Sequence, residues 1–121
     1  MASLSQEPNR HVEVLVIGAG ASGIGAAIAL LREGLSFVVL EKAETLGGTW
    51  RDNTYPGCAC DVPSALYSYS FAPNPEWTRA FAGQPEIRAY LEGVARTFDV
   101  TPHIRFGVEV RRAFFLSLIH I

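Results

Sequence analysis

The sequence predicts an α/β fold that opens with a strand, a helix and a second strand of one parallel sheet. Three segments carry this prediction. Residues 12–17 form a short β-branched apolar run, residues 22–32 place apolar side chains at helical spacing, and residues 37–40 form a second apolar run. A buried strand, a helix and another buried strand within about 30 residues make a βαβ unit.

The composition is that of an ordinary globular chain. The 121 residues suit one small domain, with 49% hydrophobic residues, 18% charged residues and a net charge of −2. Lys and Arg form no basic run, so nucleic acid is not an expected partner. The longest nearly apolar stretch, residues 24–31, is far shorter than the roughly 20 residues of a membrane span. We therefore expect no membrane association. Two cysteines without the partners of a disulfide or a zinc site predict a cytoplasmic location.

The first helix is supported by its apolar stripe and by its end. Ile24, Ile28 and Leu31 fall on one face, and the alanines between them favour a helix. Gly34 suits the C-cap, after which the chain should return to the sheet as a parallel strand.

The segment from residue 46 to residue 75 contains glycines, aromatic residues and four prolines, at positions 56, 63, 73 and 75. So many helix and strand breakers predict a long ordered loop, and such loops in compact domains are usually functional. Five aromatic residues between positions 67 and 81 could line a substrate channel, although core packing explains them better.

A second amphipathic helix is predicted over residues 84–98, where apolar side chains recur at spacings of three and four. Pro85 falls in its first turn, where proline is tolerated. Residues 103–110 alternate polar and apolar side chains through Phe106 and again from Val108, which predicts a half-buried strand that joins the sheet.

A glycine motif lies between the first predicted strand and the first predicted helix. Gly18, Gly20 and Gly23 have the G-x-G-x-x-G spacing of a dinucleotide-binding fingerprint, and Ser22 lies within it. Gly18 would permit a tight turn, Gly20 the approach of a pyrophosphate, and Gly23 the packing of helix on strand. The N–H groups at the helix start would face the phosphates. This context predicts a Rossmann-like FAD/NAD(P)-binding domain.

Glu41 ends the second predicted strand, 18 residues after Gly23. An acidic side chain at this place can accept hydrogen bonds from ribose hydroxyls, and it disfavours a ribose that carries a phosphate. The alternative is that the glycines form only a turn and that Glu41 is only a solvated strand end.

A second pair of glycines, Gly47 and Gly48, is followed by Thr49, Trp50 and Arg51. Two glycines can let the main chain approach a flat ligand that the tryptophan covers. A plain glycine turn with an anchoring core tryptophan would give the same pattern.

In their order along the chain, these motifs resemble flavin-containing monooxygenases of the Baeyer–Villiger type. The resemblance extends from about Val12 to Val110 and is more specific than the fingerprint alone. It rests on Gly18 to Gly23, Glu41, Gly47 to Trp50, Tyr55-Pro56-Gly57, Cys60-Asp61, Tyr67 to Phe71, Pro73 to Trp77, Gln84 to Ile87 and Tyr90-Leu91.

The resemblance implies an FAD site. The glycine turn and Glu41 would hold the ADP half, with Thr49 and Trp50 near the flavin. Asp61 matches a family aspartate that orients a catalytic arginine, with a loop-capping carboxylate as the alternative. The implied cofactor-binding residues are Gly18, Gly20, Ser22, Gly23, Glu41, Thr49, Trp50, Asp61 and Tyr67.

The resemblance also implies a reaction. In such enzymes NADPH reduces FAD, and O₂ adds to give a C4a-peroxyflavin. This species then oxygenates a ketone or a soft heteroatom of a small organic substrate. The cofactor carries out the difficult chemistry, while the protein orients the reactants and excludes water.

Two features expected of that family are absent from the sequence: a second glycine fingerprint for the nicotinamide cofactor, and the signature F-x-G-x-x-x-H-x-x-x-W. An arginine to partner Asp61 cannot be assigned. We therefore expect a truncated chain with little turnover by itself. It divides into a flexible leader at residues 1–11, an FAD-binding domain at residues 12–112 and an atypical or truncated tail at residues 113–121.

Two alternatives stay open. The chain could be an inactive partial gene product with an exposed sheet edge and an uncovered apolar face. It could also belong to another FAD-dependent oxidoreductase, such as an N-hydroxylating monooxygenase or an amine oxidase.

The remaining chemically active side chains have no predicted role. Cys58 and Cys60 are too close for an easy disulfide and lack the partners of a zinc site, which fits a reducing compartment and predicts no metal. His11, His103 and His120 lie far apart in the sequence without a matching nucleophile or carboxylate, so each is interpreted as structural.

Overall fold

The computed structural model describes residues 10–116. Within these residues the sheet has the strand order β1-β2-β3, and both neighbouring pairs are parallel. Residues 1–9 of the predicted leader and residues 117–121 of the predicted tail lie outside the described residues. The predicted α/β fold, βαβ start and parallel sheet are confirmed. The strands are β1 (Val14–Ile17), β2 (Phe37–Glu41) and β3 (Ile104–Phe106).

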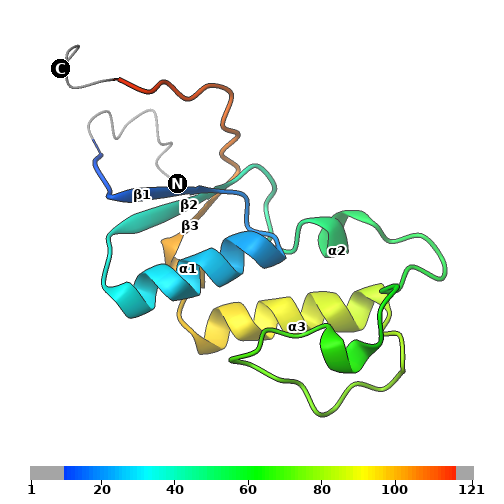
Figure 1. Ribbon diagram of the computed structural model, residues 1–121. Helices are drawn as coiled ribbons and strands as arrows, with labels where there is room; N and C mark the ends of the chain where they lie inside the picture. Colours follow the sequence, from blue (N-terminus) through cyan, green and yellow to red (C-terminus); the bar gives the residue numbers. More distant parts are fainter. Residues whose placement is uncertain (1–9, 117–121) are drawn as a thin grey trace.

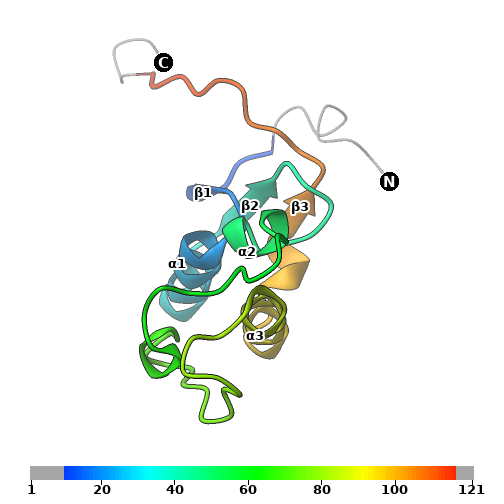
Figure 2. The same cartoon turned by 90° about the vertical axis from the view of Figure 1, so that its right-hand side faces the viewer.

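Two long helices cover one face of the sheet. Helix α1 (Ala21–Glu33) connects β1 to β2, and helix α3 (Gln84–Thr97) precedes β3. Figure 1 shows both helices beneath the strands, and Figure 2 shows the same layers from the side. Ile24, Ile28 and Ile87 are each no more than 1% exposed. Burying one such side chain contributes about 1.5–3 kcal/mol, so the predicted apolar stripes are the ones that form the core.

Glycine and proline set the helix ends. Helix α1 ends at Gly34, whose φ of 69° is left-handed and whose N–H faces the carbonyls of Leu30 and Leu31. A residue with a Cβ would be strained in this conformation. Helix α3 begins after Gly83 with Pro85 in its first turn, where the missing N–H removes no helical hydrogen bond. The Gly34 cap and the position of Pro85 agree with the sequence prediction.

The prediction that β1 is buried on both faces is wrong. Val14 and Val16 pack against the core, whereas Leu15 and Ile17 are 46% and 61% exposed. Side chains alternate between the two faces of a strand, and both long helices lie on the face of Val14 and Val16. In β2, by contrast, Val38 is only 5% exposed. One face of the sheet is therefore apolar and partly open at β1.

The strand predicted over residues 103–110 joins the sheet as expected but is much shorter. It ends at Phe106, because Gly107 adopts a left-handed φ of 71° and turns the chain. The N–H of Gly107 then donates to the carbonyl of Ala43, and that of Val108 donates to the carbonyl of Glu41. The prediction was wrong from residue 107 onward because side-chain alternation does not report this backbone turn.

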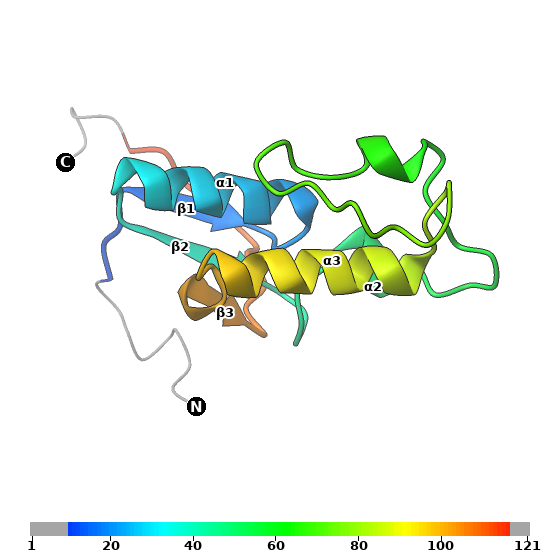
Figure 3. The same ribbon diagram turned by 90° about the horizontal axis from the view of Figure 1, so that it is seen from below.

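The proline-rich segment is a long ordered loop, as predicted. Figure 3 shows the chain between residues 53 and 83 running beside α3. The predicted loop began at residue 46, and the short helix that it contains at residues 49–52 was not predicted. The short helical turns are α2 (Thr49–Asp52), η2 (Ser64–Leu66) and η3 (Thr101–His103).

Aromatic contacts hold the loop against the two helices. Tyr69 stacks on Phe71 with ring centres 5.0 Å apart, and Phe71 meets Phe98 edge-on at 5.4 Å. The guanidinium of Arg32, near the end of α1, lies 4.8 Å from the centre of the Phe71 ring. Four of the five aromatic residues between positions 67 and 81 pack against the core, while Phe81 is 50% exposed. Core packing therefore accounts for most of this series.

Candidate functional site

The turn between β1 and α1 depends on glycine at two positions for steric reasons. Gly18 has a left-handed φ of 96°, which side-chain-bearing residues rarely adopt. A Cβ built on Gly23 would come within 1.9 Å of the Gly18 carbonyl oxygen and 3.6 Å of a Val16 methyl group. The tight turn and the close helix packing expected from the fingerprint are thus present.

Gly20 is different, because the protein itself leaves room for a side chain there. A Cβ at Gly20 would meet only the Cα of Gly48, at an ordinary contact distance of 3.7 Å. Gly20 is also the N-cap of α1, whose first turn contains no acidic residue and includes the exposed Ser22. The first N–H groups of a helix have no intrahelical partner and attract anions. The open space at Gly20 therefore lies where an anionic ligand would be stabilised.

The carboxylate of Glu41 is buried beside this turn, with the residue only 4% exposed. It accepts a hydrogen bond from the N–H of Ala19 at 3.0 Å and another from the N–H of Ala43 at 2.8 Å. Burial raises the pKa of Glu41, but these two hydrogen bonds and the nearby charge of Arg51 together hold the pKa below its usual value. Glu41 is therefore not the solvated strand end of the alternative interpretation.

The second pair of glycines meets the first turn. The N–H of Gly47 donates to the carbonyl of Ala19 at 2.9 Å. Gly47 and Gly48 have left-handed φ values of 125° and 55°, and a Cβ on Gly48 would lie 3.1 Å from the Cα of Gly20. The two glycine turns predicted separately from the sequence thus form one surface.

Trp50 and Tyr67 form a linked pair beyond the second turn. The indole N–H of Trp50 donates to the Tyr67 hydroxyl at 2.7 Å, and the two rings meet edge-on at 5.6 Å. Trp50 is 9% exposed, and its carbonyl accepts a hydrogen bond from the side chain of Gln84. Tyr67 also lines a cavity of about 210 Å³ that reaches Ala21 at the start of α1. Trp50 therefore packs in the core, while Tyr67 faces a space beside the glycine turn.

The other two predicted residues are less closely connected. Thr49 is exposed and begins α2 directly after Gly48. Asp61 is exposed in the loop, and within residues 10–116 no hydrogen bond or ion pair joins it to the glycine turns. The structure thus assembles the predicted site around the glycines and Glu41, and leaves Asp61 outside that assembly.

Arg51 is a residue of this site to which sequence reasoning gave no role. Its side chain is 12% exposed, and its guanidinium lies 3.6 Å from the Glu41 carboxylate. It also donates to the carbonyl of Thr45 at 2.7 Å. The available signal was a basic residue three positions after a pair of glycines that follows an acidic strand end. The pairing itself depends on the direction of α2.

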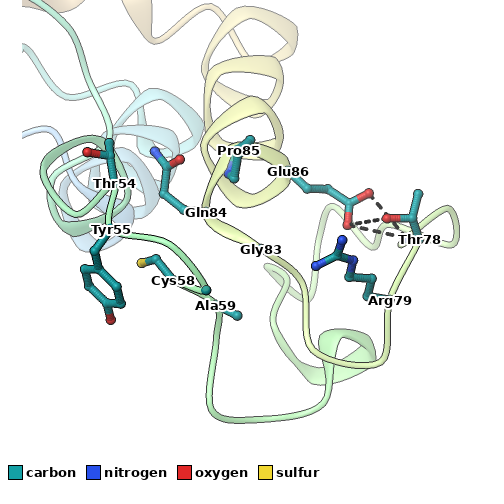
Figure 4. Close-up of a pocket in the computed structure, with 11 residues that line it drawn as sticks. Thr54, Tyr55, Cys58, Ala59, Thr78, Arg79, Gly83, Gln84, Pro85 and Glu86 are labelled. Atoms are coloured by element: carbon teal, nitrogen blue, oxygen red, sulfur yellow. Dashed lines mark hydrogen bonds between the residues drawn. The ribbon is translucent and has the colours of Figure 1, made fainter.

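A separate cavity of about 410 Å³ lies at the first turn of α3. Figure 4 shows Tyr55, Cys58, Arg79 and Glu86 among the residues that line it. Glu86 accepts hydrogen bonds from the N–H and the hydroxyl of Thr78 at 3.2 to 3.3 Å, so it anchors the loop to the helix. The predicted binding residues do not line this cavity, and we place the candidate site at the glycine turns instead.

The two cysteines and His103 contribute to packing and are not part of the candidate site. Cys58 and Cys60 are both buried free thiols. His103 stacks on Phe37 with ring centres 4.7 Å apart, which is a structural role. Residues 10–116 contain no group of three or more His, Cys, Asp or Glu side chains arranged to hold a metal ion. None of the helices in this part of the chain is long and apolar enough to cross a membrane.

Comparison with known proteins identifies the fold. Residues 16–83, more than half of the chain, match the family model described as an NAD(P)-binding Rossmann-like domain. The chain belongs to this family.

This Rossmann-like domain is also similar to parts of longer enzymes. It is 65% identical over 108 residues to a Baeyer–Villiger monooxygenase of Streptomyces coelicolor, covering 88% of this chain and 21% of the relative. It is 63% identical over 84 residues to a Baeyer–Villiger monooxygenase of Pseudomonas aeruginosa, covering 69% of this chain and 16% of the relative. The chain thus spans about a fifth of these relatives, and the family resemblance seen in the motifs is confirmed.

Solved structures give the same result. The domain superposes on OTEMO in complex with FAD and NADP with a TM-score of 0.84 and 36% identity, covering 90% of this chain and 21% of that one. It superposes on cyclohexanone monooxygenase with bound epsilon-caprolactone with a TM-score of 0.81 and 43% identity, covering 87% and 22% of the two chains. The Rossmann-like fold predicted from the fingerprint is therefore confirmed.

Proposed function

We propose that this chain is the FAD-binding portion of an NADPH-dependent flavoprotein monooxygenase that oxygenates ketones or soft heteroatoms. The observation that carries the proposal is the turn between β1 and α1. It has no room for a Cβ at Gly23, yet it leaves open space at Gly20 beside the start of a helix. Relatives named Baeyer–Villiger monooxygenase and a structural neighbour in complex with FAD and NADP support it.

The residues of the site fit the ADP half of FAD. The N–H groups at the start of α1, around Ser22, would bind the pyrophosphate. The open space at Gly20 would admit it, whereas any side chain there would occupy that space. Glu41 uses its carboxylate oxygens for two backbone N–H groups. A carboxylate has about four acceptor positions, so it can still accept from ribose hydroxyls.

We place the flavin end of the site near Thr49, Trp50 and Tyr67. Within the described residues, the Tyr67 hydroxyl accepts a hydrogen bond from Trp50 and donates none, so its proton is available to a ligand. FAD bound here would supply hydride acceptance from NADPH and activation of O₂. Asp61 keeps its proposed role of orienting a catalytic arginine, because its exposed carboxylate is free to approach one.

The proposal includes a small organic substrate together with O₂, and a cytoplasmic location. Buried free thiols at Cys58 and Cys60 support a reducing compartment, because such compartments keep thiols unpaired. We expect the 121-residue chain to bind FAD without turning over substrate by itself. Oxygenation driven by NADPH with this chain alone would contradict that expectation.

The visible absorption spectrum of the purified chain, recorded after incubation with FAD and removal of free ligand, tests the binding proposal. A retained and shifted flavin band is expected from the parent chain. Gly20→Val should abolish the band, because the valine would fill the space proposed for the pyrophosphate. Gly93→Ala, on the far helix α3, is the matched control and should retain it. A spectrum without flavin for the parent chain would overturn the proposal.

A further inference from the structure

Arg51 spans the distance between α2 and the end of β2. One of its guanidinium nitrogens donates to the Thr45 carbonyl at 2.7 Å and lies 3.6 Å from a Glu41 carboxylate oxygen. A second nitrogen lies 2.8 Å from the carboxylate of Asp52. The side chains of Arg51 and Glu41 are only 12% and 5% exposed, whereas that of Asp52 is 59% exposed. The Glu41 contact is therefore the shielded one, and shielding strengthens a charge interaction.

The backbone at Gly47 allows the Arg51 side chain to extend to Glu41. A Cβ built on Gly47 would lie 3.1 Å from the Cβ of Arg51 and 3.3 Å from its N atom. Gly47 also has a left-handed φ of 125°. The glycine at this position thus makes room for the Arg51 backbone, and α2 then directs the guanidinium back towards the strand end.

Glu41 connects this contact to the binding turn. One carboxylate oxygen accepts the N–H of Ala19, and the other accepts the N–H of Ala43 and faces Arg51. Ala19 lies between the first two fingerprint glycines, and its carbonyl accepts the N–H of Gly47. A change in the charge or position of Glu41 would therefore be transmitted directly to the turn beside Gly20.

We propose that Arg51 is a positioning residue for FAD, which keeps Glu41 ionised and fixed as the hydrogen-bond acceptor for the adenosine ribose. This inference rests on the proposed function. An ionised carboxylate accepts stronger hydrogen bonds than a protonated one, which would present a donor at one oxygen. Buried without a cation, Glu41 would take up a proton more readily, because burial disfavours the charged form.

The charged groups around Glu41 limit what else could set its protonation. Arg51 of α2 faces the carboxylate, and Asp52 of the same helix partly offsets its charge. Lys42 follows Glu41 and is exposed, while Glu44 lies near Gly107 after β3. Arg51 is the charged neighbour whose interaction lowers the pKa of Glu41. The hydrogen bonds from Ala43 and Ala19 also lower this pKa and remain in the variant, so removal of Arg51 should raise the pKa of Glu41 only in part.

The experiment compares Arg51→Gln, Arg51→Lys and Asp52→Asn with the parent chain. FAD dissociation constants are measured between pH 5.5 and 8 by flavin fluorescence. The parent, Arg51→Lys and Asp52→Asn should bind with nearly constant affinity over this range. Arg51→Gln should lose affinity as the pH falls from 8 to 5.5, whereas the parent should not, because without the guanidinium Glu41 takes up a proton at a higher pH.

A second readout does not depend on FAD. The carboxyl ¹³C signal of Glu41, assigned by its loss in Glu41→Gln, is followed by NMR against pH in the ligand-free chain. Its midpoint should be higher in Arg51→Gln than in the parent. An unchanged midpoint, or an equal loss of affinity at every pH, would overturn the role of Arg51. Failure of the parent chain to bind FAD would instead overturn the proposed function, which keeps the two failures distinct.

Discussion

At the scale of single residues, the three glycines of the fingerprint are needed for different reasons. Gly18 is required by its left-handed φ, and Gly23 by the carbonyl of Gly18 that lies against it. Gly20 satisfies neither condition, since its φ is −84° and its surroundings would accept a methyl group. We therefore propose that position 20 is kept open for a ligand, which makes the three positions separable by experiment.

Gly23→Ala should destabilise the fold, whereas Gly20→Ala should weaken FAD binding with little effect on stability. The methyl group at position 23 would lie 1.9 Å from the Gly18 oxygen, and overpacking of this kind costs about 1–3 kcal/mol. At position 20 the free energy of unfolding should fall by no more than about 1 kcal/mol, because alanine is a weaker N-cap than glycine. Urea denaturation and FAD titration of both variants measure the two effects. Equal stability losses would contradict this division of roles.

The hydrogen bond between Trp50 and Tyr67 can be tested in the same way. Tyr67→Phe removes the acceptor and leaves the buried indole N–H without a partner, which should cost about 1–3 kcal/mol in the free energy of unfolding. Ser68→Ala removes the acceptor of a longer contact, 3.3 Å from the Trp77 indole nitrogen. It serves as the matched control and should cost less. A larger loss in Ser68→Ala would show that the Trp50 contact has little energetic weight.

At the scale of secondary-structure elements, two glycines of the long helices should respond oppositely to alanine. Gly34 caps α1 with a left-handed φ of 69° and open space around it, so Gly34→Ala should destabilise by about 1 kcal/mol from backbone strain alone. Gly93 lies inside α3, where a Cβ would meet only the end of the Arg96 side chain at 3.9 Å. Gly93→Ala should stabilise by about 0.5–1 kcal/mol. Urea midpoints check both, and a shared sign would contradict the cap assignment.

Tyr69 links α1, the loop and α3. Its hydroxyl donates to the carbonyl of Ala21 in the first turn of α1, and its N–H donates to the Tyr90 hydroxyl at 3.0 Å. The Tyr90 hydroxyl in turn donates to the carbonyl of Ala72 at 2.6 Å. Burial, together with the neighbouring Tyr90 and Tyr67, raises the pKa of Tyr69 to about 12. Deprotonation would remove the donor that holds the loop to α1.

This shift gives a prediction with a definite sign. An acid whose pKa is higher in the folded state stabilises the fold fully below the unfolded pKa of about 10, and this stabilisation is lost as the pH rises towards 12. The parent chain should therefore lose stability between pH 10 and 12 more steeply than Tyr69→Phe, which has no such proton. Urea midpoints measured across that interval test it. Parallel curves for the two proteins would show that Tyr69 does not contribute.

The two long helices and the apolar strands β1 and β2 were predictable from the sequence, whereas the short helical turns were not. Repeated apolar positions indicate helices α1 and α3. Gly34 indicates where α1 ends, and Pro85 indicates where α3 begins. Helix α2 has four residues, too few to show a period, and was not predicted. The strand at β3 was predicted too long because alternation continues past Gly107, whose left-handed φ cannot be read from side-chain polarity.

Some residues of the candidate site could be predicted from the sequence, and others could not. The glycine turn and Glu41 follow from a motif whose spacing is fixed by local geometry, and the structure assembles them. Arg51 acts through a contact ten positions away in the sequence, which depends on the course of the Gly47 turn. Asp61 lies in an irregular loop, where no period relates position to contacts, and its role stays a prediction.

At the scale of the whole molecule, the two faces of the sheet differ. Helices α1 and α3 cover one face, which Figure 1 shows below the strands. On the opposite face Leu15 and Ile17 of β1 remain about half exposed, and Phe114, Phe115 and Leu116 after β3 are 62–94% exposed. Exposed apolar side chains on a sheet face favour association with other apolar surfaces. The face of β1 opposite the two helices is thus uncovered in the part of the chain that the structure describes.

The isolated 121-residue chain should therefore self-associate as its concentration rises. Sedimentation velocity at increasing concentration should show growing assemblies for the parent. The double variant Leu15→Thr, Ile17→Thr should stay closer to monomeric, because threonine retains strand propensity while reducing the exposed apolar area. Val16→Thr, on the helix-covered face, should instead lower stability without relieving association. A parent chain that remains monomeric at every concentration would show that the exposed face of β1 does not mediate self-association. It would also weaken the alternative of an incompletely folded product, whose uncovered apolar surface should aggregate.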